Sequence, residues 1–284
     1  MKLLLTGSSG FVGSYFQSNY NDIYDIETFS FLKDNLDNLD LTQIDTVIHL
    51  SALVHQMGGA TKEEYWRVNV DNTLALAQKA KQSGVKQFIF VSSVKVYGEE
   101  SDTPYSETTK CEPIDDYGLS KLEAENRLRE MADEGFTVSI LRTPIVYGKG
   151  VKANILNLVK LVDRVPVLPF GGIDNRRSMV YIGNLCDMID QIGKSGMGGV
   201  FLAGDDRPVS TTELIEIIAK AKGKNITLLN IPLFPELLKA VKPSFYKRLY
   251  ESLEADNSWT KKVLGFENGV STEKGIGKML EGMQ

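Results

Sequence analysis

A glycine-rich segment close to the N-terminus constrains the fold more than any other feature of the sequence. Residues 6–13 read TGSSGFVG; an apolar run over 2–6 predicts a strand before them, and a helical pattern continues after them to about residue 20. The glycine spacing lets the backbone turn tightly and approach a pyrophosphate, with the helix N-terminus facing the phosphates. An ordinary strand-to-helix turn would also use glycine, but the position between a strand and a helix favours a dinucleotide-binding loop.

The first half of the chain alternates strand-like and helix-like segments. After the first helix, the pattern predicts strands at residues 23–30, 46–50, 87–91 and 137–141. Between these strands it predicts long helices at residues 63–82 and 117–134. Strands that alternate with helices are typical of a parallel sheet with crossover helices. We therefore expect an α/β fold with a Rossmann-type, doubly wound parallel sheet.

The pattern changes after Gly148, where prolines become more frequent and repeats less regular. Helices are expected at 153–162 and 211–221, and a strand at 200–203 that returns to the main sheet. The sequence predicts two parts. The first is a dinucleotide-binding domain of residues 1–148 plus about 177–204, and the second is a smaller α+β substrate-binding cap of residues 149–176 and 205–284.

Composition excludes several classes of protein. The 284 residues carry a formal net charge of −5 with scattered basic side chains, which disfavours a nucleic-acid partner. Cys111 and Cys186 match no metal or redox spacing, and only two histidines are present, so we expect no metal site and a reducing compartment. The first apolar run is too short for a signal peptide, and no stretch is long enough to span a bilayer. We therefore expect a soluble, cytoplasmic protein.

Three residues form a candidate proton-transfer site. Tyr117 and Lys121 lie four residues apart on a predicted helix, so they share one face. A lysine ammonium beside a phenol favours the phenolate, which is expected to lower the pKa of Tyr117 towards the range where it exchanges protons with an alcohol. Ser93 follows the predicted strand 87–91, at the edge where parallel sheets bind ligands, and can hold the same substrate oxygen. A surface helix pair and a strand-end turn would each explain part of this pattern, but the combination favours a catalytic site.

Several segments together resemble one enzyme family. They are TGSSGFVG (6–13), HLSAL (49–53), NVDNT (69–73), SSVKVYG (92–98), YGLSK (117–121), LRTPIVYG (141–148) and RRSMVYIGNL (176–185). Over nearly its whole length the chain resembles an extended short-chain dehydrogenase/reductase, and more narrowly the NAD-dependent epimerase/dehydratase family acting on nucleotide sugars. Within that family, SSVKV and the later segments resemble a bacterial polysaccharide branch that contains 4-epimerases and 4-keto-sugar reductases.

The resemblance implies roles for individual residues. Ser93, Tyr117 and Lys121 would be catalytic, and Lys121 would also hold the nicotinamide ribose. The residues implied for the cofactor, besides the Tyr–Lys pair, are Gly7, Gly10, Phe11, Val12, Gly13, Asp40, Leu41, Leu50, Ser51, Ala52, Leu53, Asn69 and Pro144. The residues implied for the substrate, besides Ser93, are Tyr147, Asn154, Phe170 and Arg177, and His55 at a predicted strand end is a further candidate contact to the sugar. Arg177 would grip the diphosphate, for which a planar, permanently charged group is suited.

The choice between NAD and NADP stays open in the sequence. An acidic residue at the end of the second strand commonly holds the ribose hydroxyl of NAD. Here the strand ends at Ser30, and Glu27 is expected in mid-strand. Ser30 together with Lys33 would tolerate a 2′-phosphate, so we predict NAD or NADP with Ser30 among the contacts.

The resemblance implies 4-epimerisation of a UDP-hexose or UDP-N-acetylhexosamine through a 4-keto intermediate. The alternative is NAD(P)H-dependent reduction of a nucleotide 4-keto-6-deoxy sugar, favoured by the displaced acid and the short span between Gly13 and Asp40. A dehydratase is disfavoured because Val94 and Lys95 follow Ser93 where an Asp-Glu pair is usual. A non-catalytic NADP-binding sensor is also disfavoured, because such proteins generally lack the Tyr or the Lys.

Two kinds of partner besides a nucleotide sugar are considered. The resemblance implies a homodimer through the helices at 63–82 and 117–134. Apolar residues from Phe234 to Leu253 fall near helical spacing, interrupted at Pro243, with basic residues beside them. A helix that packs inwards explains this pattern best. Contact with a membrane is the alternative, expected if the substrate is linked to a lipid.

Overall fold

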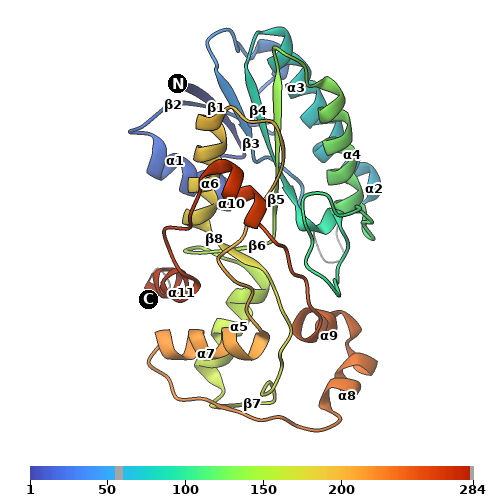
Figure 1. The fold of residues 1–284 in the computed structure, drawn as a ribbon, viewed down its shortest axis with the longest axis vertical. Coiled ribbons are helices and arrows are strands. Elements are labelled where there is room, and N and C mark those ends of the chain that lie inside the picture. Colours follow the sequence, from blue (N-terminus) through green and yellow to red (C-terminus); the bar gives the residue numbers. More distant parts are fainter. Residues whose placement is uncertain (55–59, 282–284) are drawn as a thin grey trace.

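A six-stranded parallel sheet forms the upper half of the molecule (Figure 1). The computed structural model describes residues 1–54 and 60–281. The strand order is β2-β1-β3-β4-β5-β9, and every neighbouring pair is parallel. The strands are β1 (Lys2–Thr6), β2 (Asp25–Phe29), β3 (Thr46–His49), β4 (Gln87–Ser93), β5 (Thr137–Thr143) and β9 (Gly199–Leu202). Each lies where the sequence predicts a strand, and β4 and β5 extend two residues further than predicted.

Helices cover both faces of this sheet, which explains the unbroken apolar run of β1. Leu4 packs in a hydrophobic cluster on one face, and Leu3 and Leu5 pack in another cluster on the opposite face. The helices are α1 (Phe11–Tyr20) and α6 (Ile182–Ser195) on one side, and α3 (Asn72–Gln82) and α4 (Asp116–Met131) on the other (Figure 1). Strands covered on both faces are apolar throughout. The prediction of a doubly wound α/β fold is confirmed.

The helix predicted at 63–82 is interrupted. It begins with α2 (Lys62–Tyr65), where Thr61 and Glu64 form a reciprocal capping box. It then widens into a π-helical turn, η2 (Trp66–Asp71), before α3. Such a turn inserts an extra residue into a helix and is frequent at functional sites.

The lower half of the molecule contains helices and short strand pairs outside the main sheet (Figure 1). Helices α5 (Ala153–Arg164) and α7 (Thr211–Ala221) lie where the sequence predicts helices. Two short parallel pairs accompany them, β6 (Ile145–Tyr147) with β8 (Met179–Tyr181), and β7 (Val167–Leu168) with β10 (Thr227–Leu228). The 234–253 pattern forms α8 (Phe234–Val241) and α9 (Pro243–Tyr250), separated because proline cannot continue the preceding helix.

The two helices near the C-terminus pack beside different sheets. The Leu202 N–H donates to Thr260 Oγ1 at 2.8 Å, and Gln191 Nε2 donates to Leu264 O at 2.9 Å. These contacts hold α10 (Ser258–Leu264) beside β9 and α6, while α11 (Thr272–Glu281) contacts β8 and β6. The division of the chain into residues 1–148 plus about 177–204 and residues 149–176 plus 205–284 stays a proposal.

Candidate active site

The glycine loop lies between β1 and β3, where the strand order of the sheet changes direction. Gly7 has a φ of +68°, and a Cβ there would lie 2.9 Å from the Ser51 nitrogen in the loop after β3. A Cβ on Gly13 would lie 2.2 Å from the Gly7 carbonyl oxygen. Both positions therefore require glycine. Gly10 is the N-cap residue and α1 begins at Phe11, so the first N–H groups of the helix face this loop. Such a cradle is suited to a pyrophosphate.

Asn69 joins the loop after β3 to helix α4. Its side chain is 1% exposed and lies in the π-helical turn. Its Oδ1 accepts from the Leu53 N–H at 2.8 Å, while its Nδ2 donates to Leu53 O and Ser120 Oγ, both at 3.0 Å. The half-buried residues of the tied loop are Leu50, Ser51, Ala52 and Leu53. The predicted cofactor loop is thus held beside the helix that carries Tyr117.

The end of β2 offers an acid that the sequence pattern did not reveal. Glu27 lies in mid-strand, as expected, and pairs with Lys2 at 2.7 Å. Ser30 follows the strand, and its N–H donates to the carboxylate of Asp34 at 2.8 Å. The turn after β2 therefore brings a carboxylate back to the strand end. Asp34 is separated from the strand by four residues, so only the turn geometry identifies it.

Asp40 and Leu41 lie between the short 3₁₀ turn η1 (Leu36–Asn38) and β3. Asp40 is exposed, and its carboxylate accepts from the Thr42 N–H at 3.0 Å. That hydrogen bond is the main cause that lowers the pKa of Asp40. Leu41 is 1% exposed and packs in the core, so its side chain is structural and its backbone alone is available to a cofactor.

Ser93, Tyr117 and Lys121 come together at the carboxyl end of β4. Ser93 ends the strand and its hydroxyl accepts from the Lys95 N–H at 3.2 Å, at the start of η3 (Val94–Val96). Asp115 caps α4 by accepting from Gly118 N–H at 2.7 Å, which places Tyr117 in the first turn. The Ser93 side chain hydrogen-bonds the Tyr117 phenol. One turn later, Lys121 Nζ donates to the Val91 carbonyl at 2.7 Å.

Burial governs the proton affinities of this group. It raises the pKa of Tyr117 to about 12, although the hydrogen bond with Ser93 opposes the rise. It lowers the pKa of Lys121 to about 7, and the nearby Glu125 carboxylate opposes that change. The expectation that the lysine would lower the pKa of Tyr117 is therefore not met in the protein alone. Loss of solvation outweighs the hydrogen bond with Ser93, and the charge of Asp115 raises the pKa of Tyr117 further.

A buried ion pair supports the strand end beneath Ser93. Arg142 on β5 is 2% exposed and its Nη2 lies 2.5 Å from Glu125 Oε2 on α4, a residue that is 0% exposed. Glu125 Oε1 also accepts from Ser92 Oγ at 2.5 Å, and Arg142 Nη1 donates to Tyr97 Oη at 2.7 Å. These contacts connect β4, β5 and α4 and position Ser93 relative to the helix. The signal in the sequence was an arginine within a predicted strand that is otherwise uncharged.

Two adjoining cavities open next to this site. One of about 370 Å³ is lined by Ser93, Pro144 and Lys95, together with residues from α5 and α9. The other, of about 260 Å³, is lined by apolar residues of α5 and α7. The lining residues common to both are Ile145, Asn154, Arg177 and Arg248. The two cavities are therefore neighbours that share these four lining residues, and one of them reaches Ser93 at the end of β4.

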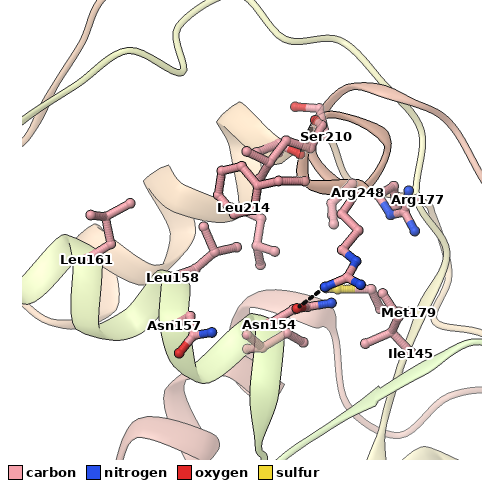
Figure 2. Close-up of a pocket in the computed structure, with 15 residues that line it drawn as sticks. Ile145, Asn154, Asn157, Leu158, Leu161, Arg177, Met179, Ser210, Leu214 and Arg248 are labelled. Carbon is pink, nitrogen blue, oxygen red and sulfur yellow. Dashed lines mark hydrogen bonds between the residues drawn. The ribbon is translucent and has the colours of Figure 1, made fainter. Parts of the chain in front are cut away.

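Two arginines stand where the cavities meet (Figure 2). Arg248 Nη1 donates to Asn154 Oδ1 at 3.4 Å, and Arg177 Nη1 donates to Glu251 O at 2.9 Å. Burial lowers the pKa of Arg177, but a guanidinium stays charged near neutral pH. Arg177 and Asn154 were predicted substrate contacts. Arg248 was noted only as a basic neighbour of an apolar stretch, because its approach to Arg177 depends on the tertiary fold.

Two predicted substrate contacts do not reach these cavities. Tyr147 is 0% exposed, and its hydroxyl donates to Asp205 Oδ2 at 2.5 Å. Phe170 is 6% exposed and packs edge-on against Phe234 in the core. Both side chains are structural, because segments distant in the sequence cover them. The prediction for His55 lies outside the described residues.

The arrangement defines a class of protein. A glycine cradle at the switch point of a doubly wound sheet, with a Ser–Tyr–Lys group at the end of β4, is the architecture of the extended short-chain dehydrogenases/reductases. The chain belongs to the NAD dependent epimerase/dehydratase family, whose model matches residues 3–204.

Known proteins similar to this chain include two curated relatives. A UDP-glucose 4-epimerase of Vibrio cholerae is 37% identical over 306 aligned residues, covering 96% of this chain and 93% of that protein. An N-acetyl-α-D-glucosaminyl-diphospho-ditrans,octacis-undecaprenol 4-epimerase of Escherichia coli O157:H7 is 29% identical, covering 81% of this chain and 75% of that protein. The solved structure of a UDP-glucuronic acid 4-epimerase from Bacillus cereus in complex with NAD shares the fold, with a TM-score of 0.79, 22% identity, and coverage of 100% and 96%.

Proposed function

We propose that this protein is an NAD-dependent nucleotide-sugar 4-epimerase whose substrate is a UDP-linked hexose or N-acetylhexosamine. The observation that carries the proposal is that Ser93, Arg177 and Arg248 line one cavity, with the Tyr117 phenol hydrogen-bonded to Ser93. A proton-transfer group and two cations suited to a diphosphate thus serve the same space. Both curated relatives are named as 4-epimerases, which supports epimerisation over reduction of a 4-keto sugar.

The residues present fit a dinucleotide. A side chain at Gly7 or Gly13 would fill the cradle at the N-terminus of α1, which supports a backbone role in holding a pyrophosphate. The carboxylate of Asp34 beside Ser30 favours NAD, because it would accept from a ribose hydroxyl and repel a 2′-phosphate. Bound NAD⁺ would supply the hydride acceptor, and its positive charge would favour the deprotonated form of the Tyr117 phenol. Lys121, one turn after Tyr117, is placed to hold the nicotinamide ribose.

The proposed mechanism uses Tyr117 as the proton carrier. The Ser93 hydroxyl holds the oxygen on sugar C4, and Tyr117 receives the proton of that oxygen as the C4–H bond breaks. Burial favours the protonated phenol. A positive charge nearby would favour its deprotonation. The 4-keto sugar then turns over, the C4–H bond re-forms on the opposite face, and Tyr117 returns the proton. No net oxidation results, because the hydrogen removed from C4 is returned to C4.

The cavities support a diphosphate substrate with an apolar or aromatic group beyond the phosphates. Arg177 and Arg248 line the cavity that Ser93 borders. They also line the cavity of Leu158, Leu161 and Leu214, which Figure 2 shows. A nucleoside is one such group. Because the E. coli relative is named for a lipid diphosphate, we include a polyprenyl-linked sugar as the second candidate substrate.

The decisive experiment compares Tyr117→Phe with the unchanged protein on a panel of UDP-hexoses, UDP-N-acetylhexosamines and a polyprenyl-diphosphate N-acetylhexosamine. Products are separated by chromatography, and the bound nucleotide is released by denaturation and weighed by mass spectrometry. We expect the unchanged protein to carry NAD and interconvert C4 epimers without added cofactor. The variant should keep NAD and lose at least about a hundredfold in turnover. An unchanged rate would refute the role of Tyr117, and stoichiometric consumption of reduced cofactor would refute epimerisation.

We also infer a homodimer in a reducing compartment such as the cytoplasm. Helices α3 and α4 lie side by side on one face of the sheet, and Leu119 of α4 is 39% exposed, which supports a helical interface (Figure 1). Cys111 and Cys186 are free thiols, which supports a reducing environment. Light scattering that gives a monomeric mass at micromolar concentration would contradict the dimer.

A further inference from the structure

Helix α8 presents apolar side chains in two directions. Phe234 and Leu238 pack against the main hydrophobic cluster. Leu233, Leu237 and Val241, which we call the outer stripe, follow one another at steps of four residues and are 76%, 62% and 67% exposed. Leu237 and Val241 are four residues apart in α8 and share one side of the helix, and Leu233 is the exposed N-cap residue before it. Because one apolar side is sufficient to pack a helix on a core, the outer stripe needs another explanation.

The backbone holds the first residue of this stripe in an unfavourable conformation. Leu233 has a φ of 64°, and it is the one non-glycine residue with positive φ in the part of the chain that the structure describes. A branched side chain is disfavoured there. Strain that places a large apolar side chain in water is typical of a binding surface rather than of a packed core.

The charge around the outer stripe has the opposite sign to the charge of the whole chain. Residues 234–250 contain four basic side chains and one acidic side chain, whereas the protein carries −5. Lys239 and Lys242 are exposed next to the stripe, and Lys239 Nζ lies 5.3 Å from the Tyr246 ring centroid. An exposed apolar stripe accompanied by lysines complements an anionic lipid surface, where lysine stems extend towards the headgroups.

We propose that the outer stripe, with Lys239 and Lys242, docks on an anionic membrane surface. The contact would be peripheral, since none of the helices within residues 1–54 and 60–281 is long and apolar enough to cross a membrane. Helix α8 stands at the lower edge of the molecule, away from the main sheet (Figure 1). Helix α9 follows directly, and its Phe245 and Arg248 line the substrate cavity. Docking would therefore bring one wall of that cavity close to the headgroups.

The test is vesicle sedimentation with the full-length protein in the absence of substrate. One vesicle type contains phosphatidylglycerol and phosphatidylethanolamine, and the other contains phosphatidylcholine alone. The variant Leu237→Glu/Val241→Glu changes two exposed residues of the outer stripe. The matched control, Ile23→Glu, changes a side chain that is 59% exposed in the connection between α1 and β2. Circular dichroism and turnover of a soluble UDP-sugar verify that each variant is folded.

We expect the unchanged protein and the control to sediment with the anionic vesicles, less so at high salt, and to remain in solution with phosphatidylcholine. The double variant should lose at least about tenfold in vesicle affinity. A second variant, Lys239→Glu/Lys242→Glu, should lose binding to anionic vesicles to a similar degree.

Absence of binding by the unchanged protein, or equal binding by the double variant, would overturn the proposal. A third outcome would also overturn it: the unchanged protein forms an oligomer and binds no vesicles, and the double variant is monomeric. The outer stripe would then join copies of this chain. Vesicle binding is measured without catalysis, so its outcome is independent of the proposed reaction.

Discussion

The side chain of Asn69 connects the loop after β3 with helix α4, and its removal gives a quantitative prediction. Asn69→Ala deletes the hydrogen bonds with the Leu53 N–H, the Leu53 carbonyl and Ser120 Oγ. Ser120 keeps its own bond to the Tyr117 carbonyl at 2.8 Å, so only the two Leu53 groups lose their partner. Leu53 is half-buried, and water can satisfy these groups in part.

The expected loss follows from these contacts. Each hydrogen bond contributes about 1 kcal/mol to the free energy of unfolding, and a buried group left unpaired costs about 1–3 kcal/mol. Because water has partial access to Leu53, we expect Asn69→Ala to lower the free energy of unfolding by about 2–4 kcal/mol in total. For a chain of 284 residues, that corresponds to a decrease in Tm of about 3–7 °C. Because the freed loop also borders the glycine cradle, NAD affinity should fall as well.

The assay combines thermal unfolding by circular dichroism with calorimetric titration of NAD. Asn72→Ala is the matched control, since Asn72 is half-buried one turn later on the same helix. The control should stay within about 1 kcal/mol of the unchanged protein. A Tm for Asn69→Ala within about 1 °C of that protein would refute the reasoning, because the three bonds would then contribute nothing measurable.

Three further predictions concern single side chains. In Gly13→Ala the new Cβ would lie 2.2 Å from Gly7 O, so the glycine cradle must shift. NAD affinity measured by calorimetry should fall at least about tenfold, and an unchanged affinity would contradict a role of the cradle in cofactor binding. In Asp34→Asn, removal of the charge beside Ser30 should raise NADP affinity relative to NAD by about fivefold, and an unchanged ratio would remove Asp34 from cofactor selection. Burial lowers the pKa of His49 from 6.5 to about 3 in the folded protein. As the pH drops below 6.5, His49 is therefore protonated in the unfolded chain but not in the folded one, and the free energy of unfolding falls. At pH 5 the loss is about 2 kcal/mol, which urea unfolding should detect and His49→Gln should abolish.

The parts of the fold predicted from the sequence are those with a local cause. The apolar run of β1 and the glycine at Gly7 depend on short-range geometry, so their places in the chain were evident. The π-helical turn around Asn69 was not predicted, because the apolar spacing of a helix changes little when one extra residue is inserted. The pairing of β6 with β8 was also missed, since three-residue strands leave too little periodicity to detect.

The same distinction between local and long-range causes applies to the candidate site. The spacing of Tyr117 and Lys121 places both on one face of α4 by helix geometry alone. Tyr147, by contrast, was predicted to contact substrate, but Asp205 and α11 enclose it. No local sequence pattern predicts that Tyr147 is buried, because the segments that cover it are far apart in the chain.

Local sequence patterns were sufficient to predict the kind of sheet, the position of the glycine loop and the shared helix face of Tyr117 and Lys121. Each follows from backbone geometry over a few residues, which is the same in any context. Only the tertiary structure decided how these groups behave. Burial raises the pKa of Tyr117 and lowers that of Lys121, and folding brings Arg248 beside Arg177 and the Asp34 carboxylate to the end of β2. The pKa of a side chain depends on its desolvation, and the interaction of two charges depends on the distance between them. For residues remote in the sequence, both are set only when the chain is packed.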